Sequence, residues 1–279
     1  MRIRLLDAGG IRTRVLESGT AGGLPLLLLH PVGFSADLWW PNMPALSASR
    51  PVCAPDLLGH GFSDLRDPAG RIGHGPILEH VAALVDALGW NDYAIAGSSF
   101  GAQIALLLAL RHGPRVRRLV VIGSGTALQT EAETIATLRR TRTNAMRALE
   151  APSAETCRTR LANLCHGLPD GAAEFLLPAQ LTAYARAGAA EAYAALLDAM
   201  TDGATARPYR VRERLGEIAA PVLLLWGRQD PRAALVRAEE ALGILPNARL
   251  TVFEDCGHLP SLEHPAAFNG TVSEFLAGA

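Results

Sequence analysis

The chain has 279 residues, of which 49% are hydrophobic and 19% are charged, and its 26 basic and 27 acidic residues leave a formal net charge of −1. The length favours one large α/β domain, with a modest insertion at most, over two ordinary domains. The balanced charge gives no electrostatic basis for binding nucleic acid or an anionic membrane, and we expect neither partner.

The chain opens with two short runs, Ile3–Leu6 and Thr13–Leu16, which flank Gly9-Gly10 and are typical of an antiparallel hairpin. Six later runs are compact and mostly apolar, which is the pattern of parallel strands covered on both faces. They are Leu26–Leu29, Val52–Ala54, Tyr93–Ala96, Leu119–Ile122, Val222–Trp226 and Leu250–Phe253.

Helical patterns alternate with these strands. They cover Ile77–Leu88, Ser99–Arg111, Arg232–Leu245 and Pro265–Ala277, where Pro265 suits the first turn of a helix. The alternation predicts an α/β fold with a doubly wound, mostly parallel sheet and helices on both faces.

The alternation stops between about Thr126 and Leu215, where no strand pattern occurs and Ala, Leu, Arg and Glu recur at helical spacing. Because this segment is inserted between two core strands, we expect a helical cap over the carboxyl ends of the strands, where open α/β sheets bind ligands. The predicted division is residues 1–126 and 216–279 for the core and 127–215 for the cap.

The strongest chemical signal is Gly97-Ser98-Ser99-Phe100-Gly101, which joins an apolar strand to an apolar-faced helix. A G-x-S-x-G pattern in that context predicts a nucleophile elbow, a sharp turn that projects a serine and needs small neighbours. Ser99 is the predicted nucleophile. Ser98 is a competing hydroxyl, for which we favour a packing role.

A serine hydroxyl needs a base, and the base needs an acid that orients it. Asp230 follows the strand ending at Trp226, and His258 lies in the loop before the last helix. The order Ser, Asp, His is that of hydrolases with this elbow, so we predict Asp230 as the acid and His258 as the general base. Glu254 and Asp255 remain alternative acids.

Acyl transfer also needs N–H donors for a tetrahedral oxyanion. Phe100, directly after the nucleophile, supplies one backbone N–H, and Val32 in the loop after an early strand is predicted to supply the other. Pro31 has no N–H to offer. We expect His30 to hold this loop by hydrogen bonds rather than to act in catalysis.

Apolar side chains near these motifs are candidates for the substrate pocket. We expect Phe34, Trp39 and Leu259 to contact the substrate, although Trp39 and Trp40 could equally pack on a helix. Asp56 and the glycines that follow it are interpreted as turn-forming residues.

Cysteine use and the N-terminus suggest an intracellular protein without a metal site. Cys53, Cys157, Cys165 and Cys256 lack the paired spacing of a zinc site, so we expect buried free thiols. The run Leu24–Leu29 is too short to span a bilayer, and no secretory leader pattern precedes it. We therefore expect a soluble cytoplasmic protein; its basic residues are all arginine, which suggests a GC-rich bacterial genome.

By these motifs the chain resembles the α/β-hydrolase superfamily over essentially its whole length. The matching segments are His30–Gly33, Asp56–Ser63, the elbow at Ser99, Trp226–Asp230 and Cys256–His258. The resemblance implies an eight-stranded, mostly parallel sheet with a helical lid, and a Ser-Asp-His triad.

Two groups within the superfamily share further features with the chain. The segment Cys256–Pro265 is similar to meta-cleavage-product hydrolases, which split carbon–carbon bonds in ring-fission products, and Asp56–Ser63 is similar to enol-lactonases. The chain departs from the first group at three places. Leu259 stands where those enzymes usually have Trp, Pro31-Val32 replaces a glycine-rich loop, and Gln180 aligns with a carboxylate-binding Arg.

Three functions follow as hypotheses. The leading hypothesis is hydrolysis of a small, largely apolar carboxylic ester or lactone through an acyl-enzyme, with no metal or organic cofactor. The second is hydrolysis of a carbon–carbon bond in a meta-cleavage ring-fission product. It requires a cationic group in the pocket, for which the candidates are Arg139, Arg142, Arg147 and Arg186. The third is a non-hydrolytic, ligand-binding member of the fold. The partner is a small molecule in each case, and the sequence leaves a homodimer open.

Overall fold

A computed structural model describes residues 1–20, 22–168 and 171–278. The strands are β1 (Arg2–Asp7), β2 (Arg12–Ser18), β3 (Leu26–Leu29), β4 (Val52–Pro55), β5 (Tyr93–Ser98), β6 (Val116–Ile122), β7 (Val222–Gly227) and β8 (Ala248–Phe253). They form one eight-stranded sheet in the order β1-β2-β4-β3-β5-β6-β7-β8. The pairs β1–β2 and β2–β4 are antiparallel and the other five are parallel. The predicted α/β-hydrolase fold is therefore confirmed.

Helices cover both faces of this sheet. The core helices are α1 (Met43–Leu46), α2 (His74–Ala87), α3 (Phe100–His112), α10 (Leu235–Leu242), α11 (Pro260–Glu263) and α12 (Pro265–Ala277). Successive side chains of a strand point to opposite faces, so Leu27 and Leu29 pack with α2 and α3 while Leu26 and Leu28 pack with α1 and α12. This two-sided burial explains why the parallel strands read as continuous apolar runs.

One core helix is shorter than the sequence pattern predicts. The sequence pattern predicts a helix over Arg232–Leu245, whereas α10 spans only Leu235–Leu242. The backbone N–H groups of Arg232 and Ala233 donate to Asp230 Oδ1 at 2.7 and 3.0 Å. These bonds hold a turn after β7 and delay the start of the helix.

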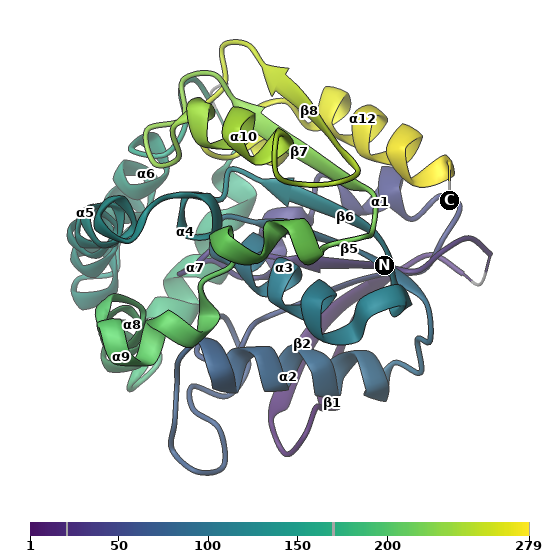
Figure 1. Ribbon diagram of the computed structural model, residues 1–279. Coiled ribbons are helices and arrows are strands. Elements are labelled where there is room, and N and C mark those ends of the chain that lie inside the picture. The colour runs from purple at the N-terminus through teal and green to yellow at the C-terminus, as the bar shows by residue number, and fades with distance from the viewer. Residues whose placement is uncertain (21, 169–170, 279) are drawn as a thin grey trace.

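In its described residues, the segment between β6 and β7 consists of helices joined by turns and loops, and its part 127–215 is called the cap below. It contains α4 (Gly125–Leu128), α5 (Glu131–Glu150), α6 (Ala154–Ala162), α7 (Leu177–Tyr184), α8 (Ala189–Thr201) and α9 (Gly203–Ala206), with short 3-10 turns. Capping boxes begin α5 at Thr130 and α6 at Ser153. Figure 1 shows α5, α6, α8 and α9 gathered on the left of the sheet, with both chain ends on the right. The predicted boundary at residue 126 falls inside α4, which packs on α3 and α10 of the core.

Cys53, Cys157 and Cys256 are buried free thiols, and Cys165 is a half-buried one. In the described ranges, no three His, Cys, Asp or Glu side chains are grouped so that they could hold a metal ion. None of the helices in those ranges has both the length and the apolar character needed to cross a membrane.

Candidate active site

Ser99 stands at the junction of β5 and α3, in a backbone conformation that few non-glycine residues adopt. Its φ is 53° and its ψ is −115°. A Cβ on Gly97 would lie 2.4 Å from Gly101 O, and one on Gly101 would lie 2.4 Å from Leu29 O. Both glycines are therefore required for the chain to turn this sharply, as the elbow pattern predicts.

The predicted acid and base meet at the carboxyl ends of β7 and β8. His258 Nδ1 lies 3.0 and 2.9 Å from the two carboxylate oxygens of Asp230. Both side chains are buried. An Nδ1–H donated to Asp230 leaves Nε2 as the unprotonated ring nitrogen, so the imidazole can act as a base.

The alternative groups lie elsewhere. Glu254 forms an exposed pair with Arg228, and neither Glu254 nor Asp255 bonds to the His258 ring in the part of the chain that the structure describes. Ser98 is fully buried, whereas Ser99 is half-buried and opens to a pocket.

This pocket lies between core and cap and is partly open to solvent. Val32, Phe34, Ser99 and His258 line it from the core side. Its cap side is lined by Thr137, Leu138, Thr141 and Asn144 of α5 and by Arg160 of α6, and Arg232 contributes from the loop after β7. The fold thus brings the predicted nucleophile and base to one cavity.

Of the two predicted oxyanion donors, Phe100 directly follows Ser99 in the chain and Val32 lines the same pocket as Ser99. Within the described ranges, neither Val32 N–H nor Phe100 N–H donates to a protein acceptor. Two free N–H groups near a serine are what a developing oxyanion requires. The Phe100 side chain itself is buried and packs edge-on against His74.

His30 holds the loop that carries Val32. Its Nδ1 lies 2.8 Å from Pro31 O, and its Nε2 lies 3.0 Å from the backbone N of Leu57. The ring therefore donates at Nδ1 and accepts at Nε2, which is the neutral form. Burial lowers its pKa well below the ordinary value, and the neighbouring His60 lowers it further. His30 thus has the structural contacts predicted for it.

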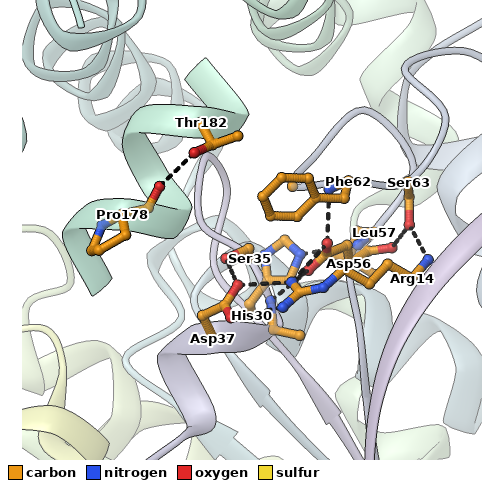
Figure 2. Close-up of polar contacts among 12 residues, drawn as sticks. Arg14, His30, Ser35, Asp37, Asp56, Leu57, Phe62, Ser63, Pro178 and Thr182 are labelled. Carbon is orange, nitrogen blue, oxygen red and sulfur yellow. Dashed lines mark hydrogen bonds and ion pairs between the residues drawn. The ribbon is translucent and has the colours of Figure 1, made fainter. Parts of the chain in front are cut away.

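A buried ion cluster of Arg14, Asp37 and Asp56 lies next to the same loop. Arg14 donates to both carboxylate oxygens of Asp37 at 2.8 Å and to Asp56 Oδ2 at 3.2 Å (Figure 2). Asp56 in turn accepts the backbone N–H groups of Ala36 and Phe62 at 2.7 and 2.8 Å. The side chain of Asp56 therefore ties two loops together, which extends the turn-forming role predicted for it.

Of the three predicted substrate contacts, only Phe34 lines the pocket. Trp39 is completely buried on the other side of the sheet, beside Phe268 at 6.2 Å between ring centroids. Leu259 is also completely buried, in a small apolar cluster with Phe34. The structure corrects both assignments, because the side chains of Trp39 and Leu259 fill the protein interior and do not reach the pocket.

The cationic residues of the pocket differ from those suggested by the sequence. Arg139, Arg142, Arg147 and Arg186 do not line it; for example, Arg142 pairs with Asp198, and Arg186 donates to carbonyls of the Asp56–Ser63 loop.

Arg160 and Arg232 line the pocket instead. A signal for Arg160 was present in the sequence, because it occupies a position in the apolar stripe formed by Cys157, Leu161 and Leu164.

Comparisons with known proteins agree with this geometry. Residues 25–265 match the family described as alpha/beta hydrolase fold. The chain is 32% identical over 283 residues to a 2-hydroxymuconate semialdehyde hydrolase of Pseudomonas sp. (strain CF600), covering 99% of this chain and 94% of that protein. It is also 32% identical over 258 residues to a pimeloyl-[acyl-carrier protein] methyl ester esterase of Aromatoleum aromaticum, covering 86% of this chain and 93% of that one.

A solved structure gives a similar result. The meta-cleavage product hydrolase from Pseudomonas fluorescens IP01 superposes with a TM-score of 0.78 and 26% identity, covering 100% of this chain and 98% of that chain. A lipase-like protein from Acinetobacter baumannii AYE reaches a TM-score of 0.83 at 25% identity, covering 99% and 91%.

Proposed function

The chain belongs to the alpha/beta hydrolase fold family, and from that premise we propose that it hydrolyses a carbon–carbon bond in a ring-fission product that bears a carboxylate. The observation that carries the proposal is the cationic wall of the pocket, formed by Arg160 and Arg232 beside Ser99 and His258. Relatives named as hydrolases of 2-hydroxymuconate semialdehyde, 32 and 33% identical over 99% of the chain, support the same substrate class.

Arg232 is the residue we assign to the substrate carboxylate. Within the described ranges its guanidinium forms no ion pair and no hydrogen bond, and its Nε is buried. Burial lowers the pKa of the guanidinium and the positive charge of Arg140 lowers it further, whereas the negative charge of Asp230 raises it, so that the net shift is downward. A partly buried cation without a counter-ion is costly, so a carboxylate brought by the substrate would be stabilising there.

The proposed reaction uses the triad in two steps. Ser99 attacks the ketone carbonyl and passes its proton to His258, while Asp230 orients the imidazole and Val32 and Phe100 N–H bind the oxyanion. The carbon–carbon bond breaks, its electron pair stays with the leaving carbon, and that carbon takes the proton from His258. Water, deprotonated by His258, then releases the acyl group from Ser99 as a carboxylic acid. None of these steps requires a metal or an organic cofactor.

Hydrolysis of a carboxylic ester or lactone is the second candidate. Two of the departures from meta-cleavage-product hydrolases, Leu259 after the base and Pro31-Val32 in the oxyanion loop, favour it, and so does the similarity to a methyl ester esterase. The same triad and the same oxyanion donors would serve. The arginines of the pocket then indicate an ester that carries an acidic group rather than a wholly apolar one.

The two candidates are separated by kcat/KM. We would compare 2-hydroxy-6-oxohexa-2,4-dienoates with p-nitrophenyl esters and expect the ring-fission products to be turned over at least about tenfold more efficiently. A tenfold preference for the esters would favour the second candidate. Ser99→Ala should abolish both activities without changing the circular dichroism spectrum. Tight binding of a dienoate with no turnover by the unaltered protein would instead indicate a ligand-binding member of the fold.

A further inference from the structure

Arg160 reaches from the cap to the oxyanion loop and binds its backbone. Its Nη1 donates to Gly33 O at 2.6 Å and its Nη2 donates to Val32 O at 3.1 Å. Nη1 also donates to the hydroxyl of Tyr184 on α7, which in turn donates to Gly33 O at 2.7 Å. Two cap helices therefore converge on one carbonyl of a loop in the core.

The guanidinium of Arg160 is buried. The side chain is 3% exposed, and no acidic side chain pairs with it in the described ranges. The aromatic rings of Phe34, Tyr184 and Tyr193 surround the guanidinium, with their centroids 4.7, 5.5 and 6.0 Å from its central carbon. Cation–π contacts offset only part of the cost of burying an ion. The neighbouring Arg158, in contrast, pairs with Glu174 at the surface.

Three successive carbonyls of the oxyanion loop are held, and two of them are held from the cap. Pro31 O accepts from two groups of the core, His30 Nδ1–H and the backbone N–H of Phe34 at 3.2 Å, whereas Val32 O and Gly33 O accept from Arg160. Val32 N–H belongs to the same planar peptide group as Pro31 O. The direction of this N–H therefore depends on the hydrogen bonds that hold Pro31 O on one side and Val32 O on the other. Gly33 has a φ of 73°, and a Cβ there would lie 2.4 Å from Arg160 Nη2.

From these contacts we infer that Arg160 is a positioning residue that makes the oxyanion hole depend on the docked cap. When the cap lies on the core, Arg160 fixes the Val32 and Gly33 carbonyls and aims Val32 N–H at the reacting carbonyl. When the cap lifts, the Val32 and Gly33 carbonyls lose their bonds from Arg160 and Tyr184, only Pro31 O keeps its bonds, and the hole is incomplete. Substrate enclosure is thereby coupled to catalytic competence. The inference rests on the proposed role of Val32 and holds for carbon–carbon and ester cleavage alike.

The test removes the guanidinium and uses a substrate without a carboxylate. For Arg160→Met we expect kcat for p-nitrophenyl acetate to fall about 100-fold with KM changed less than about threefold, because misplacing an oxyanion donor costs transition-state stabilisation only. Arg160→Lys should recover part of the loss, since an ammonium can still donate to these carbonyls. Arg158→Met on the same helix is the matched control and should behave as the unaltered protein.

A second measurement reads the oxyanion hole without turnover. A small alkyl boronic acid forms a tetrahedral adduct with an active serine, and its Kd should weaken in Arg160→Met by about the factor seen in kcat. Because no bond of a substrate is cleaved, this result is independent of which substrate class is right. Tyr184→Phe provides a gentler variant should Arg160→Met fold poorly, and we expect a loss in kcat of about five- to tenfold.

Two outcomes would overturn the inference. The first is an unchanged kcat for the neutral ester together with a raised KM for the ring-fission product, which would make Arg160 a direct substrate contact. The second is unaltered boronic acid affinity in both Arg160→Met and Tyr184→Phe, which would show that the loop keeps its shape without the cap.

Discussion

Arg232→Met removes a positive charge from the pocket wall while keeping a long, flexible side chain. A hydrogen bond to a charged group contributes about 1.5–3 kcal/mol, and about 1.4 kcal/mol corresponds to a factor of ten. Arg232 is only partly buried, so solvent screening favours the lower end of that range. We therefore expect kcat/KM for a dienoate carboxylate to fall about 10- to 30-fold, chiefly through KM.

The assay compares charged and neutral substrates on the same variant. Turnover of p-nitrophenyl acetate, which has no carboxylate, should change less than about twofold in Arg232→Met. Arg147→Met, an exposed residue of α5 outside the pocket, is the matched control and should leave both activities unchanged. Equal losses on both substrates would refute the reasoning, because they would mean that the variant disturbs Asp230 rather than a carboxylate contact.

Three further predictions concern stability. Gly101→Ala should be strongly destabilising, because the added Cβ would lie 2.4 Å from a backbone oxygen. Gly270→Ala in α12 is the matched control; its Cβ would meet no atom within 4 Å, so we expect a slightly higher unfolding temperature. Equal unfolding temperatures of the two variants would contradict this argument. Arg14→Met leaves the carboxylate of Asp56, which is 0% exposed, without its cation. We therefore expect the free energy of unfolding, measured by urea titration, to fall by about 3–5 kcal/mol. A decrease below about 1 kcal/mol would show that the cluster is dispensable. Burial lowers the pKa of His60 and His74 from 6.5 to about 4, so the unfolded chain binds more protons between these pH values. Stability should therefore fall as the pH drops through that window, by up to about 1.4 kcal/mol per pH unit for each histidine, and urea midpoints that stay constant from pH 7 to pH 4.5 would contradict the argument.

The amino-acid sequence was sufficient for the strands, the sharp turn at Ser99 and the choice of Asp230 and His258 as a candidate acid and base, because these depend on local patterns and chain order. Apolar runs bounded by turns specify parallel strands wherever both faces are covered. The requirement for Gly97 and Gly101 arises from backbone approaches within a few residues of Ser99 and the adjacent strand, so it is visible in the motif itself. Asp230 could be preferred over Glu254 from chain order alone, and His258 bonds to it.

The tertiary structure alone decided which side chains meet in the pocket. Phe34 and Trp39 are five residues apart, yet the 3-10 turn Ala36–Trp39 sends them to different sides of the fold, one to the pocket and one to the core beside α12. Arg160 and Arg232 are 72 positions apart; Arg232 lies on the loop after β7, and Arg160 joins it in the pocket only because the cap folds back over the sheet. Local periodicity shows which face of a helix is buried, but not which partner it is buried against. That partner is set by long-range packing, and here it determines where the positive charges of the pocket lie.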